Sequence, residues 1–247
     1  MIHSTLLGIL AAILSVFVAI LIEGASIRSF FHVPAMFLIV GGTLGATFAS
    51  FSISQISKAI RDTRFALQKR RETDLKLLFF RFWEKARKDG LLSLEDESKK
   101  LDNPFLQKGI QLIVDGSDPR TIEEILWEAH EEKEKEDLKS ARVYETAAGF
   151  SPTIGIIGTV LGLVTVLENL DGGTKVLGQG IATAFIATFY GISFANLILL
   201  PISNQLKVVA KRESNERQAI MRGILSLQSG ENRRILAERI DPFVNQS

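Results

Sequence analysis

Apolar and charged residues are strongly segregated along this chain. Four long windows contain no Asp, Glu, Lys or Arg: residues 2–22, 29–57, 146–167 and 176–206. A helix needs about 20 apolar residues to cross the hydrocarbon core of a bilayer, and each window is long enough. The pattern therefore predicts four membrane-spanning helices, at about 5–22, 34–52, 148–169 and 179–203. The first window lacks a basic leading segment, so we interpret it as a retained span.

The charged segments have the periodicity of helices. Residues 55–71 repeat apolar side chains at the spacing of one helix face. Residues 74–89 begin with Asp74 as an N-cap and stop at Gly90, which is a common residue at the end of a helix.

Further helices are expected to leave the membrane. Residues 105–114 form a short helix between turn sequences. The stretch 121–145 has Thr121 as N-cap and opposite charges four residues apart. It runs without a break into the third span, and residues 205–229 extend the fourth span in the same way. The expected fold is an all-α integral membrane protein.

The distribution of basic residues predicts the topology. Of the 29 basic residues, nineteen lie in residues 52–146 and eight follow residue 204. The short connection between spans one and two holds only Arg28, and that between spans three and four holds only Lys175. Cytoplasmic segments carry the excess of Lys and Arg, so both termini are expected inside the cell. The predicted domains are a hairpin of spans one and two (1–52), an inserted cytoplasmic helical domain (53–146), a second hairpin (147–204) and a cytoplasmic tail (205–247).

Composition narrows the function classes. The chain is 46% apolar and 23% charged, with a net charge of +1 and a mean hydropathy of +0.19. The absence of cysteine excludes disulfides, thiolate metal sites and a cysteine nucleophile. The sequence has no catalytic cluster, phosphate-binding loop or metal-ligand spacing. An enzyme, a nucleic-acid-binding domain and a bound cofactor are therefore not expected.

Apart from Glu168 at the outer end of the third, the predicted spans carry no Asp, Glu, Lys or Arg. Ion pumps and carriers place such residues there to relay charge. Either the protein moves no ions, or a partner subunit brings the missing charge.

Spans three and four offer small residues and hydroxyls instead. Small side chains let helices approach closely, and the candidates for this packing are Gly155, Gly158, Gly162, Ala187, Gly191 and Ala195. These faces serve either packing inside the subunit or a cavity that holds foreign helices. Four hydroxyls on these spans favour the interpretation as a cavity, although such hydroxyls often bond their own backbone. They belong to Thr159, Thr165, Thr183 and Thr188. Pro152 and Pro201 each free a backbone carbonyl near the cytoplasmic end of a span.

Five motifs together resemble the A subunit of the bacterial flagellar stator, the MotA/PomA family. They are P-x-x-G-x-x-G-T-x-x-G-L at 152–163, T-x-Y-G at 188–191, N-x-x-x-x-P-I at 196–202, A-R-K-x-G-x-L-x-L-E at 86–95 and L-x-N-x-x-x-x-K-G-I at 101–110. The resemblance covers essentially the whole chain, including its span layout and its basic tail. It implies a ring of A subunits, understood as a pentamer, in the bacterial inner membrane. The ring surrounds the single-span helices of two B subunits, and a B-subunit aspartate takes up the ion.

The resemblance also assigns roles to residues of this chain. Pro152 and Pro201 match the family's two functional prolines. Thr159 and Thr188 match hydroxyl positions associated with ion passage, and Thr183 is a further candidate on span four. Loop charges that match those linked to the rotor switch protein are Arg87 and Glu95, with Glu84, Lys88 and Asp96 as lesser members.

Alternatives to this interpretation stay open. The rivals are an ExbB/TolQ-type energiser of outer-membrane processes and a non-conducting membrane scaffold. Hydroxyl ligands favour sodium over the proton as coupling ion, but Ala187 stands where many sodium-type members have another threonine. Glu168 and Asp171 could attract cations at the outer end of span three, and we expect His3 and His32 to be incidental.

Overall fold

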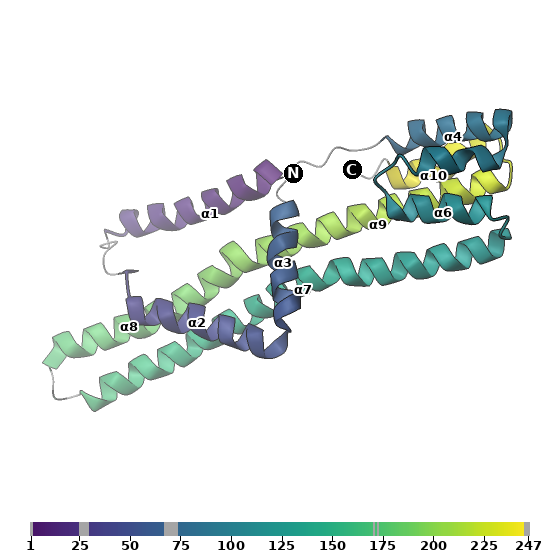
Figure 1. The fold of residues 1–247 in the computed structure, drawn as a ribbon. Coiled ribbons are helices and arrows are strands. Elements are labelled where there is room, and N and C mark those ends of the chain that lie inside the picture. The colour runs from purple at the N-terminus through teal and green to yellow at the C-terminus, as the bar shows by residue number, and fades with distance from the viewer. Residues whose placement is uncertain (1, 25–29, 67–73, 170, 172, 245–247) are drawn as a thin grey trace. The chain divides into compact units, whose positions relative to one another are not determined.

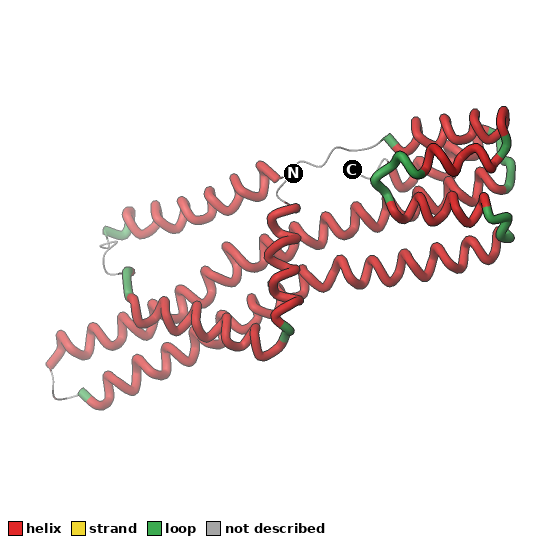
Figure 2. The backbone as a smooth tube through the Cα atoms, viewed as in Figure 1, coloured by secondary structure: helices red, strands yellow, loops and turns green. Residues whose placement is uncertain are grey.

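The computed structural model describes residues 2–24, 30–66, 74–169, 171 and 173–244, and their regular structure is entirely helical (Figures 1 and 2). The α-helices are α1 (Ile2–Ile22), α2 (Val33–Ser50), α3 (Ile53–Ala66), α4 (Leu75–Asp89), α5 (Leu94–Ser98), α6 (Pro104–Val114), α7 (Pro119–Glu168), α8 (Gly173–Phe194), α9 (Leu200–Gln228) and α10 (Arg233–Val244). A 3₁₀ turn, Leu91–Ser93, precedes α5, and a π-helical turn, Ala195–Leu199, joins α8 to α9. This confirms the all-α prediction.

Several helices are apolar enough to cross a membrane. Among the described residues, three have the necessary length and composition: Val33–Ser50, Pro119–Glu168 and Val176–Gln228. A shorter apolar helix covers Leu7–Ile22. Helix α7 contains 50 residues and joins the charged stretch 121–145 to the apolar stretch that follows. The prediction of one uninterrupted helix there is confirmed.

Local sequence signals explain most helix ends. The Asp74 carboxylate accepts a hydrogen bond from Leu77 N, and Gly90, at φ +83°, ends α4, as predicted. The predicted N-cap Thr121 is wrong. The carboxylate of Asp118 accepts from the amides of Arg120 and Thr121, so the cap lies three residues earlier and α7 begins at Pro119. Proline suits this first position because its missing N–H would have no helical partner.

Two further segments bear on the expected boundaries. Helix α3 is described as Ile53–Ala66 and includes residues 55–66 of the predicted helix 55–71, whereas residues 67–71 lie outside the described part of the chain. The fourth apolar stretch is not a uniform α-helix, because Leu200 N donates to Ala195 O across a π turn just before Pro201. A π turn inserts one extra residue into a helix and is frequent at functional sites.

The chain divides into two compact units. The first consists of Met1–Lys69 and Leu138–Lys207, and the second of Arg70–Asp137 and Val208–Ser247. The second unit has an apolar core in which Phe79, Ile122 and Ile220 are fully buried. The first unit buries mainly small side chains such as Ala184, Ala187 and Ala195. Close helix packing, rather than a core of large side chains, therefore organises the first unit.

Candidate functional site

Helices α7 and α8 approach each other closely because small residues line both faces. A Cβ atom added at Gly155 would lie 3.1 Å from Ala187 O, and one added at Gly191 would lie 2.7 Å from Ser151 O. At Gly162 an added Cβ would lie 2.9 Å from the Ala184 Cβ. Larger side chains here would push the two backbones apart.

The remaining small residues follow the same pattern. A Cβ at Gly158 would lie 2.6 Å from the Ala187 Cβ, and Ala187 itself is 1% exposed. Ala195 is buried in a small cluster with Ala147 and Ala148. These positions are occupied by contacts within one subunit, so their small side chains are not free to receive a foreign helix.

The close approach brings two predicted hydroxyls together. Thr159 Oγ1 lies within hydrogen-bond distance of Thr188 Oγ1, 3.0 Å from Ala184 O and 3.1 Å from Gly155 O. A threonine hydroxyl has one proton and two lone pairs, so Thr159 satisfies only one of these acceptors at a time. The pair therefore places two oxygen atoms with spare lone pairs at the half-buried seam between the helices.

Thr183 lies elsewhere, at the contact between α8 and the start of α2. Its Oγ1 is 3.4 Å from His32 Nε2, and His32 Nδ1 accepts the Ala35 amide at 3.3 Å as the N-cap of α2. The Tyr190 hydroxyl donates to Phe30 O and accepts from His32 N. The expectation that His32 is incidental is thus wrong. The available signal was Pro34, because proline is tolerated in the first turn of a helix and so marks a helix start near His32.

Both predicted prolines interrupt helical hydrogen bonding. Pro152 lies inside α7, beside the Ser151 hydroxyl that donates to Gly191 O at 2.8 Å. Its missing N–H leaves the carbonyl four residues earlier, that of Ala148, without its usual donor. Pro201 stands in the first turn of α9, directly after the π turn.

Outside its contact with α8, much of the α7 apolar segment is left exposed by the other described residues. Its exposed side chains are mostly apolar: Ile156, Ile157, Val160, Leu161, Leu163, Val164 and Leu167. Thr165 is exposed as well, and its hydroxyl donates to Leu161 O at 3.1 Å. Glu168 and Asp171 are also exposed, at the end of this segment. The part of the chain that the structure describes holds no cluster of acidic or histidine side chains suited to a metal ion.

The loop charges lie on the surface of the second unit. Arg87 is exposed, and its guanidinium lies 5.1 Å from the centre of the Trp83 ring. Lys88 and Asp96 are exposed as well. Exposed charges contribute little to stability, so folding does not require them.

The carboxylates nearby are partly engaged in ion pairs. Glu95 pairs with Lys99 at 2.6 Å, and Glu84 pairs with Arg233 at 3.4 Å. Glu97, which the sequence did not single out, accepts hydrogen bonds from Lys85 and Lys100, and these bonds lower the pKa of its carboxyl. This surface of the second unit therefore carries acidic and basic side chains that pair with close neighbours.

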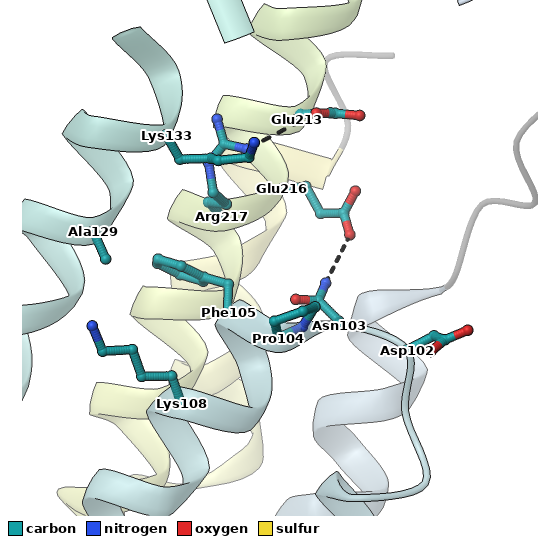
Figure 3. A pocket seen from close by; sticks show the side chains of 10 residues that line it. All are labelled: Asp102, Asn103, Pro104, Phe105, Lys108, Ala129, Lys133, Glu213, Glu216 and Arg217. Atoms are coloured by element: carbon teal, nitrogen blue, oxygen red, sulfur yellow. Dashed lines mark hydrogen bonds and ion pairs between the residues drawn. The ribbon is translucent and has the colours of Figure 1, made fainter. Parts of the chain in front are cut away.

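A hollow of about 370 Å³ lies within the second unit, between α6, α7 and α9 (Figure 3). Its charged lining residues are Lys108, Lys133, Arg217, Asp102, Glu213 and Glu216. Arg217 is bound to Asp137 at 2.9 Å, and Glu216 accepts from Asn103 at 3.3 Å. Positive and negative groups balance, so this hollow has no preference for ions of one sign.

Comparison with known proteins identifies the family. The model of the MotA/TolQ/ExbB proton channel family matches residues 97–219. Motility protein A of Borreliella burgdorferi is 32% identical over 217 residues, covering 87% of this chain and 83% of the relative. Chemotaxis protein PomA of Vibrio alginolyticus is 30% identical over 245 residues, covering 98% and 95%.

Solved structures agree with this result. The flagellar MotAB stator complex from Bacillus subtilis contains a chain that superimposes with a TM-score of 0.89 at 28% identity, covering 98% of this chain and 96% of that one. The similarity to PomA extends over nearly the whole chain, and so does the match to a stator chain. The chain belongs to the motility protein A/PomA branch of the MotA/TolQ/ExbB family.

Proposed function

We infer that this chain is the A subunit of a flagellar stator, which works with a B subunit to couple ion flow across the membrane to torque on the rotor. Its relatives are motility proteins, and a stator complex contains a chain of the same fold. The protein is a component of an ion-driven motor and not an enzyme.

One observation carries the mechanism. The four apolar windows contain no carboxylate, lysine or arginine, yet α7 and α8 hold a pair of threonine hydroxyls at their seam. A wall of this kind offers oxygen ligands but no group that takes up and releases charge. We therefore assign the titrating carboxylate to an aspartate in the single span of the B subunit, with Thr159 and Thr188 beside its path.

The proposed arrangement has four spans in the inner membrane and both termini in the cytoplasm. Residues 53–146 form the inserted cytoplasmic domain, and several copies, proposed to be five, surround the B helices. The apolar exposed face of α7, which includes Val160 and Val164, supports a position against the B subunit or a neighbouring copy. The excess of basic residues in the long loop and tail supports the orientation.

The coupling ion is proposed to be sodium, with the proton as the alternative. Hydroxyl oxygens replace part of the hydration shell of a hard cation, whereas a proton needs only a carboxylate and a water path. Motility measured against external sodium at fixed pH decides between the two. If cells swim at full speed without sodium, the sodium assignment is wrong, but the proposed stator function is not affected.

Torque is proposed to pass through the surface charges of the second unit, chiefly Arg87 and Glu95, to the rotor switch protein. Electrostatic matching sets register and encounter between partners even where it adds little stability.

Complementation tests the function. The chain and its B subunit are expressed together in a cell that lacks its own stators, and swimming is expected to return. If they instead restore an outer-membrane uptake process, the ExbB/TolQ alternative is correct. If the chain binds a B subunit but restores neither process, it is a scaffold.

A further inference from the structure

An apolar hollow of about 320 Å³ lies within the first unit, bordered by α1, the start of α2 and the end of α8 with its π turn. Figure 1 labels these three helices. Helix α1 contributes Ile13, Val16 and Ile20, while Met36 and Val40 come from α2. None of the lining residues is charged, and the side-chain polar atoms are the hydroxyls of Tyr190 and Ser193.

Helix α1 turns one face toward this hollow. Ile13, Val16 and Ile20 are half-buried and recur at the three- and four-residue spacing of one helix face. Leu14 and Val18, on the other side of the helix, are 63% and 43% exposed. The backbone of α1 makes its main contacts with the π turn, so the hollow separates α1 from α2 and α8 along part of its length.

Water is a poor occupant for this space. A buried water needs two to four polar partners, and the Tyr190 hydroxyl is already bonded to Phe30 O and His32 N. An empty hollow would leave the surrounding side chains without dispersion contacts on one side. A helix of another subunit, about 10 Å across, is too large for a volume of 320 Å³.

We propose that one acyl chain of a membrane phospholipid occupies this hollow and packs α1 against α2 and α8. Hydrocarbon is the medium that surrounds these apolar helices in a bilayer, and part of one flexible chain fits a hollow of about 320 Å³ with an uncharged lining. The inference rests on the membrane-spanning arrangement proposed above but not on torque generation.

The test uses the complex of this chain with its B subunit in bilayers of phosphatidylcholine that carries a photoactivatable diazirine in mid-chain. After irradiation, mass spectrometry locates the modified residues. The matched variants are Val16→Phe, which fills the hollow, and Val18→Phe, which makes the same change on the exposed side of α1. Ser193→Leu fills the hollow from α8, with Ser193→Ala as its control, in case Val16→Phe fails to assemble.

Labelling is expected to concentrate on the lining residues and to fall several-fold in Val16→Phe and Ser193→Leu, but not in Val18→Phe or Ser193→Ala. Two results would overturn the proposal. In the first, the lining residues and other exposed apolar residues are labelled equally, and the filling variants do not change this; the label then reports only ordinary contact with the bilayer. An unlabelled hollow in the wild-type complex means that side chains of a neighbouring copy fill it. Ion flux measured on the same complex tests the stator function separately.

Discussion

The hydroxyl of Thr159 has more acceptors within reach than its single proton can serve. It lies close to Thr188 Oγ1 and to the carbonyls of Ala184 and Gly155. A hydroxyl in this position exchanges partners at little cost, and its lone pairs stay available to an ion or a water molecule. Polar groups inside a membrane are retained where they serve a function.

Replacing Thr159 by Val keeps the shape of the side chain and removes only the hydroxyl. We expect ion flux through the complex with the B subunit to fall about tenfold, which corresponds to about 1.4 kcal/mol, the order of one hydrogen bond. Thr159→Ser keeps the hydroxyl and is expected to retain most of the flux. Equal flux in Thr159→Val and the wild type would remove the hydroxyl pair from the ion path.

His130 gives the second unit a predictable response to pH. Its side chain is buried, and burial lowers the pKa of the imidazole from the ordinary value of 6.5, although nearby Glu134 opposes the shift. The unfolded chain therefore binds a proton more readily than the folded one below pH 6.5. Stability from neutral His130 is present above that pH and is lost as the pH falls.

The melting temperature of the complex is accordingly expected to drop between pH 7.5 and 5. In His130→Gln, which cannot titrate, the drop is expected to be smaller. Scanning calorimetry at several pH values measures both slopes, and parallel slopes would show that His130 does not contribute.

The predictability of these residues from sequence was uneven. The motifs named Thr159 and Thr188 as candidates, and the structure brings them together. They did not reveal that Thr183 contacts His32, because the two residues are 151 positions apart and depend on how α2 meets α8. Contacts between distant segments are set by packing, which a single sequence does not display.

At the scale of helices, capping chemistry predicted boundaries well where one residue dominated. Asp74 and Gly90 mark the two ends of α4 as expected. At the start of α7, Asp118 and Thr121 compete for the same role, and Asp118 prevails because its carboxylate reaches two amides. No residue in the sequence signalled the π turn before Pro201 in a comparable way. This turn holds one residue more than a regular α-helical turn at the junction of α8 and α9.

The two prolines are expected to matter for function more than for stability. A proline inside a helix costs about 3 kcal/mol, so Pro152→Ala and Pro201→Ala are expected to leave the melting temperature of the complex equal or higher. Torque is expected to fall because the freed carbonyls near the cytoplasmic end disappear. Tethered-cell rotation measures it, and wild-type rotation in both variants would reduce the prolines to local features of the helices.

At the scale of the whole molecule, charge segregation was the most informative property of the sequence. It predicted apolar helices and the lack of an internal charge carrier. The two compact units, however, each combine segments that are distant in sequence. Helices α7 and α9 pass through both units, which periodicity alone does not disclose.

The surface charges predict an effect on rotor engagement. Arg87→Glu is expected to reduce rotation several-fold while assembly with the B subunit stays intact, because Arg87 is exposed. Arg81→Glu makes the same change at another exposed position of α4 and is expected to rotate normally. A charge reversal on the rotor switch protein is expected to restore rotation in Arg87→Glu. Equal defects in both variants would mean that only net charge matters.

The central claim is that this chain forms the wall of an ion path and that a partner supplies the charge carrier. Ion flux into liposomes measures this directly, with the chain alone, with its B subunit, and with a B subunit whose intramembrane Asp is changed to Asn. We predict no flux with the chain alone, flux with the B subunit, and none after the Asp change. Substantial flux through the chain alone would contradict the account.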